Sequence, residues 1–455
     1  ALVRAPAAAR PSRLRLGPLV AVMFFTVSGG PFGFEGLVGA VGPGLAVVLL
    51  VATPLLYSVP ETLLVGELAS MLPVEGGYYQ WVKRAFGPFW GFWNGWLSWT
   101  YSLLDMAIYP VLFLQYAQYF APGLPRFETW VLAVALIWAA TGLNLRGTRV
   151  VGTASGWFVG AVLAPFGVLA LVALVRWLGG PARPLPLTPF HAAGASFLGA
   201  LGVGVSQSIW NYSGWDNAST IGGEIEQASA TYPRALARAL PLVTVVYLVA
   251  ILPALALTDW RAWTDGAWPT LARGVVGEWL GVWVALAGMV SAFALFNALL
   301  LVYSRIPLVL AQDGLLPARL ARTDARGTPR TAVLVSAVVY SGFALLPFGG
   351  LLAGDVLLYT AALALEFAAL IRLRRREPEL RGAFRVPVSV PMLVALASLP
   401  LVLIVAGVGL EVQSRAIGLP GVLVAALLAV AGPPVYMALR ARRSEERPSV
   451  PAIGP

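Results

Sequence analysis

Long apolar runs follow one another along almost the whole chain, and they constrain the fold more than any other feature. A helix needs about 20 apolar residues to cross the hydrocarbon core of a bilayer. Only 11% of the 455 residues are charged, against about 25% in soluble proteins. Because a backbone inside the bilayer must satisfy its own polar groups, such runs fold as helices. The sequence therefore predicts an all-α polytopic membrane protein.

We expect twelve transmembrane helices, arranged as five plus five with two appended spans. The first repeat covers about 17–177, the second about 196–371, and the appended spans about 388–439. Residues 71–89 place aromatic residues beside cations, a pattern typical of an interfacial or re-entrant helix. The twelve expected spans are about 17–41, 44–70, 89–121, 128–145, 149–177, 196–222, 235–257, 278–304, 331–347, 351–371, 388–411 and 418–439.

The placement of the positive charges predicts the orientation of the chain. Most of the 31 Lys and Arg residues fall in alternate loops, which we assign to the cytoplasmic side. Both tails, 1–16 and 441–455, are then cytoplasmic and flank a multi-pass domain over 17–440 in the cell membrane. We interpret the first apolar run as a retained span, because it is too long for a signal peptide. This placement of arginines also accounts for the net charge of +10 without a nucleic-acid partner.

Two of the expected spans are interrupted in the middle of the membrane. Ser28–Gly33 breaks the first span with three glycines and a proline, and Asn211–Asn217 breaks the sixth. Peptide groups freed at such a break must line a cavity or bind a ligand. Two broken spans at corresponding places in two halves point to the binding site of a transporter. The alternative is that glycine and proline merely kink two packed helices.

Acidic side chains accompany these breaks. Glu35 follows the first break, Asp216 lies in the second, and Asp105 lies midway along the third span. Intramembrane acids are costly and are functional by default. Because no Lys or Arg matches them in depth, we expect a cationic ligand, a proton carrier or both. The alternative is a neutral acid held by local hydrogen bonds.

Aromatic side chains are expected to close this site and to hold an ammonium group by cation–π contact. Trp210 and Trp215 flank the second break and are the expected gates. Tyr109 and Phe296 approach from the third and eighth spans. The chain has no cysteine and one histidine, His191, in an expected external loop. We therefore expect no metal site, no cofactor and no enzyme activity.

Several long motifs occur in an order that resembles the amino acid–polyamine–organocation transporter superfamily over about residues 15–440. Within it, the likeness is greatest to polyamine-uptake and L-type amino acid permeases. The motifs are SGGPFGFE at 28–35, PETLLVGEL at 60–68, GPFWGF at 87–92, DMAIYPVLFL at 105–114 and WDNAST at 215–220.

This resemblance implies the inverted five-plus-five fold of the leucine-transporter type, with broken helices 1 and 6 and alternating access. It implies that peptide groups near the breaks bind the substrate and that Trp210 gates the site. An acid at the position of Asp216 takes part in proton sensing in related exchangers. Together with the residue-based arguments, the expected substrate-binding set is Ser28, Gly29, Gly30, Gly33, Glu35, Asp105, Tyr109, Trp210, Asn211, Gly214, Asp216, Phe296 and Asn297.

Three departures from the family pattern bear on substrate and coupling ion. Asn297 stands where polyamine permeases tend to have an acid, which keeps amino acids as possible substrates. Ser291 is followed by Ala292, so the Ser/Thr pair of sodium-coupled relatives is missing. The fifth span has no lysine, the residue that replaces sodium in some proton-coupled members. Proton coupling is favoured over sodium, with Asp216, Asp105 and Glu35 as the carriers.

The sequence thus predicts a proton-coupled symporter of polyamines or amino acids. An amino acid exchanger without ion coupling and an amine-binding nutrient sensor on a transporter fold remain as alternatives. The oligomeric state and a single-span partner subunit are left open.

Overall fold

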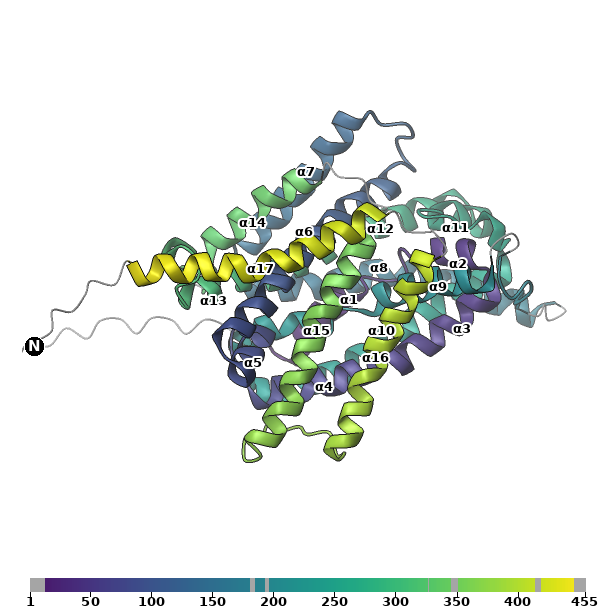
Figure 1. The fold of residues 1–455 in the computed structure, drawn as a ribbon. Coiled ribbons are helices and arrows are strands. Elements are labelled where there is room, and N and C mark those ends of the chain that lie inside the picture. Colours follow the sequence, from purple (N-terminus) through teal and green to yellow (C-terminus); the bar gives the residue numbers. More distant parts are fainter. Residues whose placement is uncertain are drawn as a thin grey trace, which may run out of the picture.

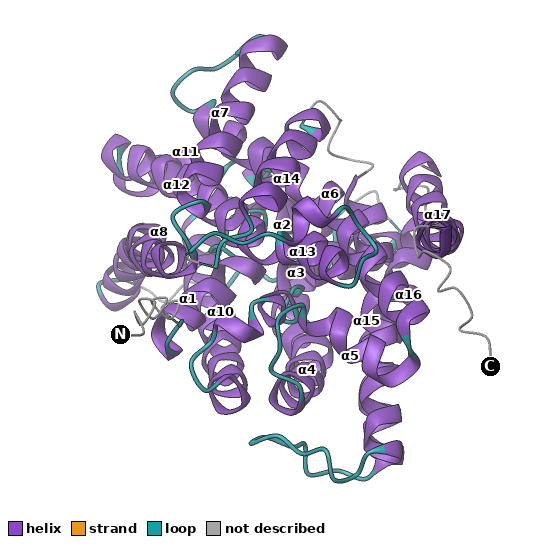
Figure 2. Cartoon of the chain, turned by 90° about the vertical axis from the view of Figure 1, so that its left-hand side faces the viewer, coloured by secondary structure: helices purple, strands orange, loops and turns teal. Residues whose placement is uncertain are grey.

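The computed structural model describes residues 13–180, 185–192, 196–325, 327–344, 351–413 and 419–445. Within these ranges the chain forms helices and connecting loops, and two isolated β-bridges are its only strand-like pairing (Figure 1). Figure 2 shows the helices packed side by side, with loops at their ends. Most of the expected N-terminal tail and the last ten residues of the expected C-terminal tail lie outside the described residues.

The helices follow the expected spans in chain order, with a short helix in the expected interfacial segment and two further short ones. The first half contains α1 (Leu16–Val27), α2 (Glu35–Val41), α3 (Pro43–Thr53), a π-helical segment (Pro54–Ser58), α4 (Val59–Met71), α5 (Gly77–Phe86), α6 (Pro88–Ala117), α7 (Arg126–Asn144) and α8 (Thr148–Leu178). The second half contains α9 (Phe197–Tyr212), α10 (Ala228–Leu257), α11 (Trp268–Val276), α12 (Glu278–Tyr303), α13 (Arg305–Gln312), α14 (Arg330–Phe343), α15 (Leu351–Arg376), α16 (Val390–Gln413) and α17 (Leu419–Glu445).

Eight helices in the described part of the chain are long and apolar enough to cross a membrane. Three shorter apolar helices, Leu16–Val27, Arg330–Gly342 and Ala425–Ala441, coincide with further expected spans. The outer helices expose large apolar side chains, such as Trp157 on α8 and Leu427 on α17. These surfaces suit a lipid environment, and the chain is a multi-pass membrane protein.

Two expected spans differ in detail from the observed helices. The second span changes to a π-helix at Pro54, because proline has no N–H for the normal helical bond. The sixth span does not resume as an α-helix after its break but continues as two short 3₁₀ helices, Asn217–Thr220 and Gly222–Glu224. The expected loops before the eighth and ninth spans contain α11 and α13.

The packing places the two breaks at the centre of the bundle. α6 packs against both α12 and α15, and α1 packs against α8, α10 and α12 (Figure 1). The segment after α9 contacts α1 and α12 through its first 3₁₀ helix. Side chains of α6, α12 and α15 therefore face the interrupted helices.

Candidate substrate site

The break between α1 and α2 is built from glycines in conformations that other residues rarely adopt. Gly29 and Gly30 have φ angles of 63° and 112°. The Ser28 hydroxyl accepts a hydrogen bond from Gly30 N–H at 3.1 Å, and Ser291 Oγ of α12 donates to the Gly29 carbonyl at 2.5 Å. Side chains thus satisfy part of the backbone that the break releases.

The second break begins where α9 ends at Tyr212. Gly214 has a φ of 98°, and its N–H donates to the Tyr359 hydroxyl of α15 at 3.0 Å. A Cβ on Gly214 would lie 2.6 Å from the carbonyl oxygen of Thr26, at the end of α1. The second break therefore lies directly against the last turn of α1, where the first break begins, and only glycine permits this approach.

A small cavity of about 40 Å³ lies between the breaks and the facing helices α6, α12 and α15. Six of the expected binding residues line it: Ser28, Asp105, Tyr109, Trp210, Asn211 and Gly214. Since one water needs about 10–15 Å³, the cavity has room for about three waters. The structure therefore shows a closed conformation.

The lining is acidic and rich in hydroxyl groups. Two carboxylates, Asp105 and Asp355, share the cavity with four tyrosines, and no Lys, Arg or His is among the described residues that line it. The tyrosines are Tyr101, Tyr109, Tyr303 and Tyr359. Such a lining can accept hydrogen bonds from a cation and has no positive charge for an anion.

Asp105 is held between two tyrosines. Tyr109, one turn further along α6, donates to Asp105 Oδ1 at 2.7 Å. Tyr303 of α12 donates to Asp105 Oδ2 at 2.8 Å. These two bonds fix the carboxylate in the wall of the cavity.

Asp355 was not among the residues expected from the sequence, although an acid in an apolar span is the signal that identifies it. Its side chain comes from α15 and is 6% exposed. Within the described part of the chain, Asp355 Oδ1 has no hydrogen-bond partner. A buried acceptor without a partner is costly, so a donor from a ligand would stabilise it.

A second acidic cluster lies beside the cavity, around the hydroxyl of Tyr359. This oxygen is 2.6 Å from Glu61 Oε1 of α4 and 2.7 Å from Asp216 Oδ1. It also accepts the N–H of Gly214. A hydroxyl has one proton and can donate to only one of the two carboxyl groups. A proton on one of the two carboxyl groups would let both short contacts be full hydrogen bonds.

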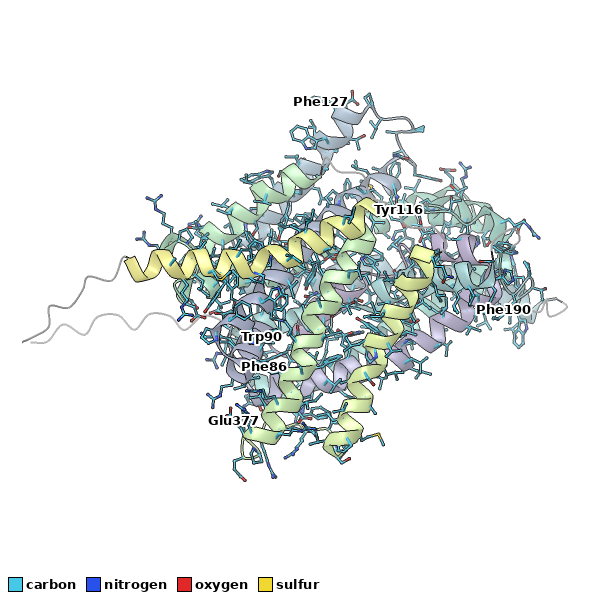
Figure 3. All side chains as sticks on the ribbon, in the orientation of Figure 1. Phe86, Trp90, Tyr116, Phe127, Phe190 and Glu377 are labelled. Atoms are coloured by element: carbon cyan, nitrogen blue, oxygen red, sulfur yellow. The ribbon has the colours of Figure 1, made fainter. Side chains whose placement is uncertain are left out.

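Glu35 does not line the cavity. Its Oε2 accepts from Gly33 N–H at 2.8 Å, and its Oε1 accepts from the Tyr116 hydroxyl at 2.5 Å and from Gly266 N–H at 3.1 Å. Gly266 belongs to the loop before α11, so Glu35 ties this loop to the first break. Figure 3 labels Tyr116 toward the end of the molecule that carries α11.

The same loop packs closely on α2. Burial raises the pKa of Asp265, whose carboxylate lies against Gly36. Trp268 Nε1 of α11 donates to the Pro31 carbonyl at 3.1 Å. The loop, residues 258–267, and α11 lie over the first break, and together they are called the cover below.

The other expected residues lie outside the cavity lining. Asn297 accepts from Asn144 Nδ2 at 2.7 Å, and the Phe296 ring lies 6.1 Å from the Tyr340 ring. Trp215 is fully buried in the core. The remaining members of this group are Gly29, Gly30, Gly33, Glu35 and Asp216.

No set of three or more His, Cys, Asp or Glu side chains among the described residues could hold a metal ion.

Gly33 lies against the Trp210 ring, because a Cβ on this glycine would be 3.3 Å from a ring carbon. Trp210 therefore joins the first break to the cavity wall.

Comparison with known proteins identifies related transporters. A family model described as amino acid permease matches residues 19–428. The chain is 37% identical over 395 residues to the polyamine transporter RMV1 of Arabidopsis thaliana, covering 85% of this chain and 78% of that protein. It is 36% identical over 390 residues to the polyamine transporter PUT1 of Oryza sativa subsp. japonica, covering 85% and 72%.

More distant similarity extends to amino acid transport and to a solved structure. The aromatic amino acid transport protein AroP of Escherichia coli (strain K12) is 25% identical over 321 residues, covering 68% of this chain and 67% of AroP. The crystal structure of the Eremococcus coleocola manganese transporter, in complex with an aromatic bis-isothiourea substituted compound, superposes with a TM-score of 0.58. It is 13% identical and covers 94% of this chain and 93% of that one, so it supports the fold alone.

Proposed function

Because this chain belongs to the amino acid permease family of transporters, we propose that it carries a cationic amine of the polyamine class across the membrane, coupled to protons. The observation that carries the proposal is the cavity with two carboxylates, Asp105 and Asp355, and no cationic side chain among its described lining residues. Each carboxylate would bind one ammonium group of a diamine, with tyrosine hydroxyls completing the contacts. The polyamine transporters among the relatives agree with this substrate class.

The state of the peptide N–H groups at the breaks favours an amine over an amino acid. A substrate carboxylate needs free donors, which the sequence places at the glycines. The N–H groups of Gly30, Gly33 and Gly214 already donate to Ser28, Glu35 and Tyr359, respectively. In this conformation a substrate carboxylate could bind these N–H groups only by breaking their internal hydrogen bonds. Asp355 Oδ1, in contrast, can accept a hydrogen bond from an ammonium group without breaking another one.

The cluster of Glu61, Asp216 and Tyr359 supports proton coupling. The short contacts of the Tyr359 hydroxyl with both Glu61 and Asp216 favour one proton on the carboxyl pair. Glu366, buried two turns further along α15, adds a third acid that interacts electrostatically with both. We assign proton binding to this cluster, with Asp216 as the member that belongs to the second break.

The proposed architecture is twelve spans in an inverted five-plus-five repeat with two appended helices, and both termini cytoplasmic. Direct contact between the break after α9 and the end of α1, where the first break begins, supports this arrangement. Because the cavity holds only about three waters, a polyamine must enter through a more open conformation. We propose that access to this cavity alternates between the two sides of the membrane.

The test is ligand-dependent thermal stability of the purified protein and of its Asp355→Asn and Asp105→Asn variants. Putrescine and spermidine are expected to raise the unfolding temperature of the wild type. Each variant should lose about tenfold or more in amine affinity, because a hydrogen bond to a charged group contributes about 1.5–3 kcal/mol. Glu128→Gln, on the exposed surface of α7, is the matched control and should bind as the wild type does.

The standard amino acids are screened beside putrescine and spermidine, on the wild type and on both variants. Stabilisation by amino acids instead of amines, unchanged in Asp355→Asn, would refute the polyamine proposal and favour an amino acid permease. An amine effect that survives both substitutions would place the site elsewhere.

A further inference from the structure

A groove separate from the substrate cavity lies at the end of the bundle that carries α5. It has a volume of about 840 Å³ and is walled by α5, the first turn of α6, the segment after α13 and the C-terminal half of α17. This size is within the usual range of about 300–1,000 Å³ for ligand pockets. Figure 3 labels two of its residues, Phe86 and Trp90, at this end.

One wall of the groove is a continuous row of aromatic rings. Trp90 lies 6.3 Å from Phe86 and 5.5 Å from Phe89, and Phe89 lies 5.4 Å from Tyr436 of α17, measured between ring centroids. Trp90 is 38% exposed. Tryptophan and tyrosine concentrate at the headgroup level of a membrane, because their rings combine an apolar body with a polar atom.

The wall from α17 is anchored firmly to α6. Pro433 has no N–H, so the carbonyl of Ala429 lacks its helical donor, and Trp93 Nε1 donates to it at 3.1 Å. Trp96 Nε1 donates to the neighbouring Leu428 carbonyl at 2.8 Å. The groove is therefore a preformed feature between two connected helices.

The charges at the groove are complementary to an anion. Lys83 Nζ lies 2.6 Å from Asp313 Oδ2, and the Tyr79 hydroxyl also donates to Asp313, so the one acid in the lining is compensated. Arg440 of α17 also lines the groove, and within the described part of the chain no carboxylate pairs with it. A guanidinium offers forked donors that match the oxygens of a phosphate.

We propose that this groove binds an anionic phospholipid from the leaflet at this end of the bundle. The Arg440 guanidinium holds the headgroup phosphate, and an acyl chain lies along Phe86, Phe89 and Trp90. A basic pocket between membrane helices beside an aromatic row fits a phospholipid better than a soluble anion, which needs no apolar wall. This inference is independent of the proposed substrate and of the coupling ion.

The experiment titrates dioleoylphosphatidylglycerol or dioleoylphosphatidylcholine into the purified full-length protein in neutral detergent. Bound lipid is counted by native mass spectrometry, and the unfolding temperature is followed in parallel. We expect phosphatidylglycerol to bind and stabilise in preference to phosphatidylcholine. Arg440→Gln should weaken that binding about fivefold, and Arg440→Lys should retain most of it. Arg319→Gln, at an exposed arginine of the 3₁₀ helix Ala318–Ala321, is the matched control.

Three results would overturn the inference. The first is equal binding of both lipids, and the second is phosphatidylglycerol binding that Arg440→Gln leaves unchanged. The third is equal stabilisation by inorganic phosphate alone, which would make the groove a site for a soluble anion. Because Arg440 is exposed, its substitution should not prevent folding.

Discussion

The hydroxyl of Tyr359 connects the acidic cluster to the second break, and its removal is a sharp test at the residue scale. Tyr359→Phe removes an atom that contacts Glu61, Asp216 and Gly214 N–H together. The loss should reduce stability by about 1–3 kcal/mol, because it leaves buried polar groups without a partner. Uptake driven by an imposed pH gradient should fall more than amine binding does.

The measurements are thermal unfolding and amine uptake into proteoliposomes with and without a pH gradient. The control is Tyr340→Phe, since Tyr340 is also buried and its hydroxyl lies 3.3 Å from the Ser102 hydroxyl. Equal responses to the gradient in Tyr359→Phe and wild type would remove the cluster from proton coupling.

At the same scale, the sequence identifies acids by their position in apolar runs but not by their neighbours. Asp105 and Asp216 stand out in this way and lie in or beside the cavity. Glu61 and Asp355 carry the same signal, but their roles depend on tertiary structure. Glu61 contacts Tyr359, which is 298 residues away in the sequence. Asp355 lines the cavity because its face of α15 points inward. Only packing decides this, and it also separates Asn297 from the cavity through its hydrogen bond with Asn144.

At the scale of elements, α2 can pack closely against the cover because glycines, among them Gly39, face it. A Cβ on Gly39 would lie 1.8 Å from the backbone carbonyl oxygen of Trp263, so Gly39→Ala must displace the loop before α11. We expect a loss of about 1–3 kcal/mol, as for other overpacked sites, seen as a lower unfolding temperature. Gly142→Ala, in α7, is the control, because no atom lies within 4 Å of its new methyl group.

If Gly39→Ala is as stable as Gly142→Ala, the cover does not pack on α2 as described.

The helices themselves were largely predictable, because glycine and proline mark the ends of α1, α2 and α9. The cover was not, since α11 has only nine residues and lies in a stretch that reads as a loop. Its structure depends on tertiary contacts with the first break.

At the scale of the whole molecule, the closed cavity and the cover make access the property to test. Glu35 accepts one hydrogen bond from Gly33 in the first break, one from Gly266 in the cover and one from Tyr116 of α6, so it joins the cover to the first break. Glu35→Gln replaces one acceptor oxygen by a donor, so at least one of these bonds is lost and the cover should loosen. Because the chain has no cysteine, a single introduced cysteine reports access without background.

Val356→Cys places a thiol in the cavity lining, where the closed structure should protect it from a bulky maleimide. In the Glu35→Gln background we expect labelling at least about tenfold faster, since a shift of 1.4 kcal/mol toward the open state changes its population tenfold. Spermidine should slow this labelling if it occupies the cavity. Ala369→Cys, fully buried on the same helix, should remain unlabelled in both backgrounds. Unchanged labelling at Val356→Cys would mean that access is controlled elsewhere, and that the bonds of Glu35 serve only to stabilise the fold.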